Sequence, residues 1–152
     1  MHLNSSLNTW LLAFRLKTLP PAIAPVIIGL SFAYHDGYFQ PLIAFCTLLA
    51  SILIQIGTNL ANDVYDFEKG TDAEDRLGPK RVTQSGLLTS SQVKKGMLFS
   101  FVFALGIGCY LAWIGGLPIV IIGSIAIISG YGYTGGPFPL GYNGLGDLFV
   151  FI

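Results

Sequence analysis

Charged side chains are scarce in this sequence. Asp, Glu, Lys and Arg make up 11% of its 152 residues, whereas a soluble domain usually carries about 25%. Hydrophobic residues account for 53% of the chain, and the mean hydropathy is +0.66. A water-soluble fold with so little charge would be unusual, because its surface has to be solvated. The net charge of +0 also gives no electrostatic reason to expect nucleic acid or another polyanion as a partner.

Cysteine is equally scarce, and its placement excludes the common cysteine motifs. Cys46 and Cys109 each lie in an apolar run, and the sequence has no CxxC and no cluster of Cys and His. Such spacing provides neither a zinc site nor a redox pair. We therefore expect two free thiols that pack as small apolar side chains, with a disulfide or a metal pair as the less favoured alternative.

Three long stretches contain no Asp, Glu, Lys or Arg at all: residues 18–35, 37–62 and 96–146. A helix that crosses a bilayer needs about 20 residues, most of them apolar. The first two stretches each fit one such helix, whereas the third is too long for one and has a natural break at Gly115–Pro118. The predicted spans are Leu19–Tyr34, Leu42–Asn62, Met97–Trp113 and Ile119–Tyr133.

These spans predict an all-α, polytopic transmembrane helix bundle. A fifth apolar helix would begin near Leu145 and is cut off at Ile152, so we expect about four spans plus the start of a fifth. We also expect the chain to be a truncated copy of a longer protein, the alternative being a short natural protein with a hydrophobic end. Before the first span, apolar residues recur at helical spacing: Leu7, Trp10, Leu11 and Phe14. They predict either an amphipathic helix at the headgroup boundary or a membrane-dipping start of the first span.

The basic residues predict the orientation of the bundle. All eight Lys and Arg residues lie either just before the first span or between the second and the third. The turns at His35–Gln40 and Gly115–Pro118 have none. Because cytoplasmic loops are enriched in Lys and Arg, the N-terminus, the long loop and residues Tyr133–Asp147 are placed in the cytoplasm. We expect an integral protein of the plasma (inner) membrane whose polar end faces the cytoplasm.

Four polar residues follow one another at helical spacing where the second span ends. Asn59, Asn62, Asp63 and Asp66 are three or four positions apart, so on a helix they share one face. Carboxylates crowded at the membrane edge repel each other and are costly to desolvate. A divalent cation relieves both costs, and carboxylate and amide oxygens suit Mg²⁺. The sequence therefore predicts a magnesium site formed by Asn62, Asp63 and Asp66, which would bind a substrate diphosphate.

The loop that follows mixes acidic and basic side chains. Its acidic residues fit an ordinary solvated loop: Glu68, Glu74 and Asp75. Arg81 can fork onto phosphate oxygens, and we favour a role for it in substrate binding and catalysis. Lys80 can add a point charge to the same phosphates or simply set the topology. The same two interpretations apply to Arg15 and Lys17.

The segment Asn62-Asp63-x-x-Asp66-x-x-x-Gly70-x-Asp72 resembles the first aspartate-rich motif of the UbiA-type intramembrane prenyltransferases. Flanking segments are more specifically similar to the menaquinone-pathway branch of that family, the 1,4-dihydroxy-2-naphthoate polyprenyltransferases: Phe14–Pro20, Gln84–Leu87, Tyr133–Pro137 and Gly144–Asp147. The resemblance covers essentially the whole chain. It implies a protein of nine helices in which residues 1–152 are the N-terminal part of one transmembrane prenyltransferase domain. The second aspartate-rich motif would lie beyond Ile152, and Asp147 stands where an acidic residue, often Glu, is expected.

The resemblance also implies a reaction. A polyprenyl group would pass from polyprenyl diphosphate to 1,4-dihydroxy-2-naphthoate, with loss of diphosphate and CO₂, to give demethylmenaquinone in a Mg²⁺-dependent step. Asp63, Asp66 and Arg81 would stabilise the charge that builds on the leaving diphosphate. The long tail of the substrate would lie among membrane lipid and apolar helices. We expect the 152-residue chain by itself to be inactive, because half of the metal site would be missing.

An allylic cation needs a dry site lined by aromatic faces. Tyr131, Tyr133 and Tyr142 are candidates, although an interfacial aromatic belt explains these tyrosines equally well. Taken together, the residues expected to bind substrate are Arg15, Lys17, Asn59, Asn62, Asp72, Lys80, Tyr131, Tyr133, Tyr142 and Asp147.

Two other functions stay open at this point. One is a related UbiA-type transferase with a different acceptor, such as 4-hydroxybenzoate, homogentisate or haem. The other is a fragment of a transporter or channel that uses Asp63 and Asp66 as an ion site. Transporters usually bind ions near the middle of the membrane, whereas these carboxylates lie at one end beside a basic loop. That placement favours diphosphate chemistry.

Overall fold

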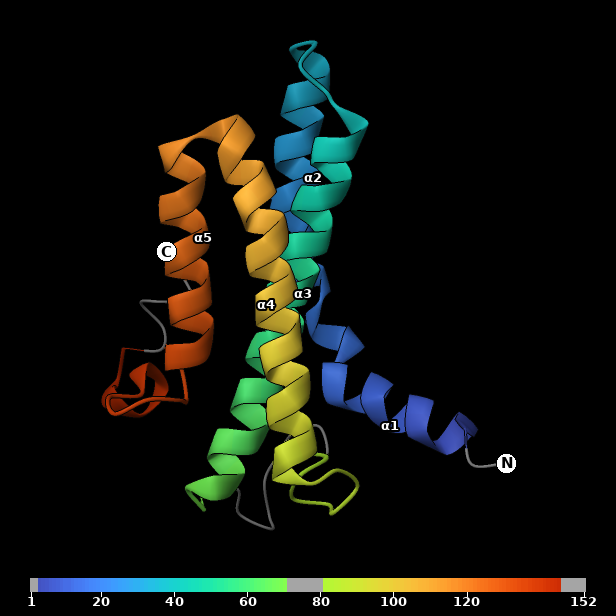
Figure 1. Cartoon of the computed structure of the whole chain (residues 1–152), viewed down its shortest axis with the longest axis vertical. Coiled ribbons are helices and arrows are strands. Elements are labelled where there is room, and N and C mark those ends of the chain that lie inside the picture. Colours follow the sequence, from blue (N-terminus) through green and yellow to red (C-terminus); the bar gives the residue numbers. More distant parts are fainter. Residues whose placement is uncertain (1–2, 71–80, 146–152) are drawn as a thin grey trace.

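The computed structural model describes residues 3–70 and 81–145, which form helices and turns without any strand. The elements are α1 (Leu3–Phe14), the 3-10 turn η1 (Leu16–Thr18), α2 (Pro20–His35), α3 (Pro41–Glu68), α4 (Ser90–Gly115), α5 (Leu117–Gly132) and the 3-10 turn η2 (Leu140–Asn143). They form an up-and-down bundle around α3, which contacts α1, α2, α4 and α5 (Figure 1). The predicted all-α architecture is confirmed.

Helices α2 to α5 occupy the positions of the four predicted spans. α3 and α4 have 28 and 26 residues, and their most apolar windows have mean hydropathies of 1.9 and 2.1, enough to cross a membrane. Residues Ser6–Thr18 and α2 pass the same test jointly but are bent by 58°. α5 is apolar and shorter, with 16 residues. The described chain is thus a membrane helix bundle in which α3 and α4 are each long and apolar enough to cross a membrane as a single helix.

The start of α4 differs from the prediction. It begins at Ser90 and not at Met97, because Thr89 caps the helix. The Thr89 hydroxyl accepts a hydrogen bond from the Gln92 amide, and the Gln92 side chain accepts one from the Thr89 amide. This reciprocal capping box satisfies two backbone donors that the first turn leaves unpaired. Lys94 and Lys95 consequently lie on α4 and not in the loop before it.

The N-terminal helix is set apart from α2 by a break at Arg15. Arg15 has a left-handed backbone (φ 52°, ψ 59°) and is the only non-glycine residue with positive φ in the described part of the chain. α1 packs on the bundle through Trp10, whose ring lies 2.8 Å from where a Cβ on Gly96 would be. Ala13 is buried while Leu7 is exposed. α1 is therefore a separate helix that packs on the bundle through Trp10 and Ala13, whereas Leu7 of the predicted apolar stripe is exposed.

The buried hydrophobic core lies around the C-terminal half of α3. Three of its residues, Leu60, Ala61 and Val64, are completely buried. Their neighbours come from α1, from the turn after residue 81 and from α4: Ala13, Val82, Leu88, Val93 and Met97. Val82 has no exposed surface, so the turn that contains it is docked onto α3. This core supports the polar residues at the same end of the helix.

The two ends of the bundle differ in character. The end of α3, the start of α4, the turn at 81–88 and the segment after α5 lie together at one end (Figure 1). The turns that join α2 to α3 and α4 to α5 lie at the other end. Among the described residues, the polar segments that the sequence predicts to lie on one side, the end of α3, the turn at 81–88 and the segment after α5, therefore lie at the same end of the fold.

An apolar cavity of about 510 Å³ lies between α2, α3, α4 and α5. Representative lining residues are Val26, Ile54, Ala104, Ala112, Ile119 and Ile127. Gln55 also lines it, and its side chain donates to the Asn59 side-chain oxygen at 3.4 Å. The cavity thus borders the polar face of α3 through one pair of amide side chains.

Candidate functional site

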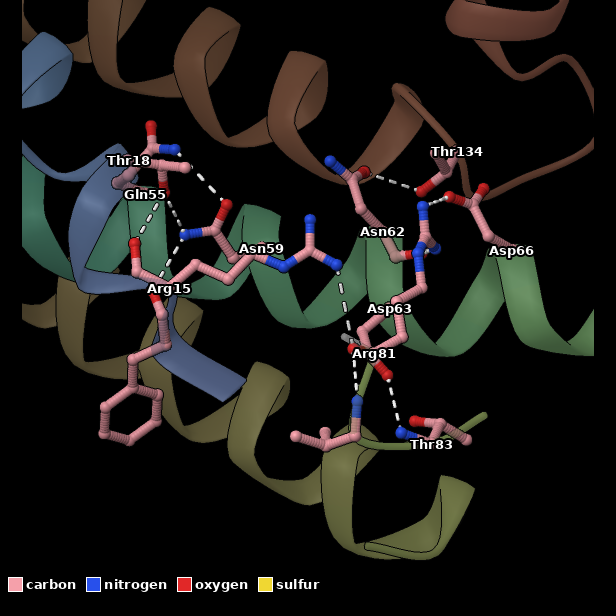
Figure 2. A network of polar contacts seen from close by, with 12 residues as sticks. Arg15, Thr18, Gln55, Asn59, Asn62, Asp63, Asp66, Arg81, Thr83 and Thr134 are labelled. Carbon is pink, nitrogen blue, oxygen red and sulfur yellow. Dashed lines mark hydrogen bonds and ion pairs between the residues drawn. The ribbon is translucent and has the colours of Figure 1, made fainter. Parts of the chain in front are cut away.

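The polar residues of α3 form two pairs with different neighbours (Figure 2). Asn59 and Asp63 are four positions apart, and so are Asn62 and Asp66. Residues at this spacing lie one above the other on a helix. The first pair faces the α1–α2 break and the backbone of the turn after residue 81. The second pair faces the segment after α5 and also contacts the Arg81 side chain. The predicted single face is therefore divided between two sets of contacts.

Asn59 and Asp63 are both buried, and each joins α3 to another segment. The Asn59 side-chain nitrogen donates to the Phe14 carbonyl at 2.9 Å and to the Thr18 hydroxyl at 2.8 Å. Asp63 is 1% exposed. Its two carboxylate oxygens accept hydrogen bonds from the backbone amides of Val82, at 3.1 Å, and Thr83, at 3.0 Å. This pair therefore fixes the positions of two loops.

Arginine side chains balance both carboxylates. The Arg15 guanidinium lies 3.7 Å from Asp63 Oδ2, and Arg81 forms an ion pair with Asp66. Arg81 also donates to the backbone carbonyl of Asn62 and is only 3% exposed. Removing one partner of a buried ion pair typically costs about 3–5 kcal/mol, since the other charge stays behind without compensation. The site is thus an alternating group of two anions and two cations, largely shielded from solvent.

The segment that follows α5 covers the second pair. The Thr134 hydroxyl donates to Asn62 Oδ1 at 2.8 Å, and the Tyr142 hydroxyl donates to Asp66 Oδ1. Lys69, at the end of α3, donates to the Thr134 carbonyl and lies 5.0 Å from the centre of the Tyr142 ring. Two hydroxyl groups therefore contact the oxygens that could serve as ligands.

Not every predicted residue joins this cluster. Lys17 lies on η1 and is exposed. Tyr131 pairs with Tyr65 through their hydroxyls at 3.2 Å, and the Tyr133 carbonyl accepts a hydrogen bond from the Gly141 amide within its own loop. Three further predicted residues, Asp72, Lys80 and Asp147, lie outside the described residues. The structure brings together Arg15, Asn59, Asn62, Asp63, Asp66, Arg81 and Tyr142.

Asn62 Oδ1 and the Asp66 carboxylate fit a Mg²⁺ site that is completed by substrate. Both are hard oxygen ligands on the same side of α3. Within residues 3–70 and 81–145, no three Asp, Glu, His or Cys side chains gather closely enough to hold a metal by themselves. Mg²⁺ commonly uses one or two carboxylates together with water and substrate phosphates. This part of the chain can therefore supply a portion of such a coordination shell.

Some members of the site were not predicted. Thr134 and Thr18 could have been found, because both lie in segments that the resemblance singled out. The amides of Val82 and Thr83 could not, because every residue except proline has a backbone N–H and the sequence does not show which ones face a carboxylate. Glu68 forms an ion pair of 2.7 Å with Lys94, and both side chains are partly exposed, which fits the interpretation of Glu68 as a solvated residue.

The fold and the site define the chain as an integral membrane helix bundle with a buried, charge-balanced polar site at one end. Residues 22–152 match the model of the UbiA prenyltransferase family. The chain belongs to this family, as the resemblance of its aspartate-rich motif indicated.

Several curated relatives share the same name. The chain is 38% identical to the 1,4-dihydroxy-2-naphthoate octaprenyltransferase of Escherichia coli (strain K12), over 97% of this chain and 50% of that protein. It is 36% identical to the protein of that name from Mycobacterium tuberculosis, with the same coverage of both chains. A third relative, 33% identical over 91% of this chain, is the chloroplastic 2-carboxy-1,4-naphthoquinone phytyltransferase of Arabidopsis thaliana. The chain spans about half the length of the first two relatives. No solved structure matches it.

Proposed function

We propose that the intact protein transfers a polyprenyl group from polyprenyl diphosphate to 1,4-dihydroxy-2-naphthoate, releasing diphosphate and CO₂ and giving demethylmenaquinone. The observation that carries the proposal is the buried Asp66–Arg81 pair beside Asn62 at one end of a membrane helix. This end is linked to an apolar cavity by Gln55, which lines the cavity and donates a hydrogen bond to Asn59. A substrate with an anionic head and a hydrocarbon tail matches this charged cluster and the apolar cavity. Residues 1–152 would be the N-terminal part of one transmembrane prenyltransferase domain.

The acceptor is chosen from the names of the relatives. The octaprenyltransferases and the phytyltransferase are named for different prenyl groups. Their acceptors, 1,4-dihydroxy-2-naphthoate and 2-carboxy-1,4-naphthoquinone, are both naphthalene-derived rings with a carboxyl group at the same position. The relatives therefore share a class of acceptor ring and differ in the prenyl group that they transfer.

Asn62 and Asp66 would hold Mg²⁺. The sequence also predicts Asp63 as a ligand, but both of its oxygens already accept backbone hydrogen bonds. When bound, the metal would stabilise negative charge on the leaving diphosphate. Arg81 would bind the diphosphate oxygens with its planar guanidinium, which is suited to forked contacts with phosphate. Arg15, next to Asp63, would add a second positive charge to the same end. The burial of this cluster would exclude water, which strengthens each of these electrostatic contacts.

The location of the site would follow from the solubility of the substrate. The hydrocarbon tail would lie in the apolar cavity between α2 and α5, and the head would lie beyond Asn59 at the end of α3. We place this end at the cytoplasmic face of the plasma membrane, because all Lys and Arg residues of the sequence lie before the first span or between the second and the third.

The proposal is tested on the intact protein in membranes. Polyprenyl diphosphate and 1,4-dihydroxy-2-naphthoate are supplied with Mg²⁺, and the prenylated product and CO₂ are measured. We expect turnover that stops with EDTA and returns when Mg²⁺ is added in excess. The Asp66→Ala variant is expected to insert normally and to be inactive. Turnover that is insensitive to the chelator would contradict the metal assignment.

A competition experiment tests the acceptor. The same preparation is given equal amounts of 1,4-dihydroxy-2-naphthoate and 4-hydroxybenzoate with one prenyl diphosphate. We expect product from the naphthoate alone. Preferential use of the benzoate would overturn the choice of acceptor and leave only the family-level activity.

A further inference from the structure

We infer that Asp63 is a positioning residue that holds the turn carrying Arg81 and the break carrying Arg15 on α3, and that it does not bind metal. The inference deepens the proposed function, on which it rests, because it separates the roles of two neighbouring carboxylates. Asp66 would face the substrate, whereas Asp63 would hold the arginine that acts on it.

The two hydrogen bonds of Asp63 come from backbone amides. Its Oδ2 accepts from the Val82 amide and its Oδ1 from the Thr83 amide, so each oxygen takes one of two consecutive N–H groups. Bonds from N–H groups to a charged acceptor are stronger than those between neutral groups. At 1% exposure, the carboxylate has no access to water that could replace them. Moving Asp63 toward a metal would leave both amides buried without an acceptor, at a cost of about 1–3 kcal/mol for each.

The geometry of the turn links this contact to Arg81. Arg81 directly precedes the two amides that Asp63 holds, and Val82 anchors the same turn in the core with no exposed surface. Asp66 lies almost one helical turn further along α3 than Asp63. Fixing the backbone at 82–83 therefore sets the position from which the Arg81 side chain reaches Asp66 and the Asn62 carbonyl (Figure 2).

The same carboxylate faces the N-terminal break. Arg15 approaches Asp63 Oδ2 from a left-handed backbone conformation, which is uncommon for a residue with a side chain and persists only where surrounding contacts hold it. Asn59, one turn before Asp63, supplies such contacts through Phe14 and Thr18. Asp63 therefore joins the two segments that bring arginines to the site. The side-chain oxygens of Asn62 and Asp66 instead accept hydrogen bonds from the hydroxyls of Thr134 and Tyr142.

The test compares Asp63→Asn with Asp66→Asn in the intact, detergent-solubilised protein. Mn²⁺ replaces Mg²⁺ as a paramagnetic probe, with inorganic diphosphate present, and binding is followed by electron paramagnetic resonance. We expect the Asp63→Asn variant to keep its Mn²⁺ dissociation constant within about twofold, and the Asp66→Asn variant to bind at least about tenfold more weakly, as is typical for loss of a charged contact. Equal weakening in both variants would overturn the inference.

Hydrogen exchange gives a readout that does not depend on activity. Asp63→Asn is expected to raise the exchange rate of the 81–88 segment about tenfold or more, because an amide side chain offers one acceptor oxygen where two are needed. Asp66→Asn is the matched control and is expected to leave the Val82 and Thr83 amides protected. Unchanged protection of these amides in Asp63→Asn would contradict the positioning role.

Kinetics show whether Asp63 acts through Arg81. For prenyl transfer, Asp63→Asn should raise the KM for polyprenyl diphosphate while the half-saturating Mg²⁺ concentration stays the same. In an Arg81→Ala background the same substitution should add less than about twofold, because residues that act through each other are not additive. Fully multiplicative losses would overturn the link. Asp63→Glu, which keeps the charge and both oxygens, is the second variant and should recover part of the affinity if the asparagine variant does not fold.

The failure of the two proposals can be told apart. A wild-type protein that binds Mn²⁺ and diphosphate but prenylates neither acceptor would reject the proposed function. The metal-binding and exchange comparisons between Asp63→Asn and Asp66→Asn would still decide the role of Asp63.

Discussion

Asp63 and Asp66 are the same residue type, three positions apart on one helix, and yet have different neighbours. Asp63 accepts two backbone hydrogen bonds from the turn after residue 81, whereas Asp66 contacts the side chains of Arg81 and Tyr142. Helical spacing predicted that both would gather at one end of the helix, and the structure places them there. It could not divide them between roles, because the division depends on segments that are distant in the sequence.

Tyr142 offers a test of the Asp66 assignment at the level of one hydroxyl group. The Tyr142 hydroxyl donates to Asp66 Oδ1, so a cation at Asp66 has to compete with this contact. We expect Tyr142→Phe to bind Mn²⁺ about threefold more tightly or better, in line with the net value of one hydrogen bond. The measurement is a Mn²⁺ titration without substrate, with Tyr38→Phe at the other end of the bundle as the control. Weaker binding in Tyr142→Phe would contradict a ligand role for Asp66.

Residue types and their spacing predicted part of the polar cluster that the structure brings together. Acidic and amide residues at helical spacing identified Asn59, Asn62, Asp63 and Asp66, and a basic residue soon after the acidic stretch identified Arg81. Tyr142 was proposed for its aromatic face, whereas in the structure its hydroxyl bonds to Asp66. Backbone donors and hydroxyl partners were missed, because their role depends on tertiary contacts that spacing does not encode.

At the level of elements, the predicted helices are present and their ends are the main differences. Long stretches without charge located α2 to α5, since charge is costly within a bilayer. The early start of α4 depends on the reciprocal bonds of Thr89 and Gln92, which the prediction did not consider. The break before α2 depends on the left-handed backbone of Arg15, a conformation for which sequence favours glycine and not arginine.

Close contact between α3 and α5 gives a prediction about packing. A Cβ on Gly130 would lie 2.3 Å from the Thr58 Oγ1, and that hydroxyl is bonded to the Ile54 carbonyl. We expect Gly130→Ala to lower the unfolding free energy by about 1–3 kcal/mol, as overpacking usually does. Thermal unfolding in detergent measures the effect. Gly123→Ala is the matched control on the same helix, because a Cβ there meets nothing within 4 Å. Equal stability of the two variants would show that the helices can separate at no cost.

At the level of the whole molecule, the two ends of the bundle should lie on opposite sides of the membrane. Tyr38 is 79% exposed at the end without basic residues, and Lys95 is exposed near the other. In a background with Cys46→Ala and Cys109→Ala, we expect Tyr38→Cys to react with a membrane-impermeant maleimide on intact cells. Lys95→Cys should react only after permeabilisation, because basic segments stay in the cytoplasm. The reverse pattern would place the site outside the cell.

Three segments that are far apart in the chain converge on α3: residues 14–18, 81–83 and 134–142. Each contacts a side chain whose direction is set by the helical phase, which advances by about 100° per residue. Inserting one residue into α3 just before Asn59 would rotate all four polar side chains away from these segments at once, although no functional residue would be lost. An insertion in the short connection between α2 and α3 would leave the directions of the four polar side chains around α3 unchanged. In homologous proteins, length changes should therefore accumulate in that connection and be absent from the interior of α3, even where its lipid-facing residues diverge freely.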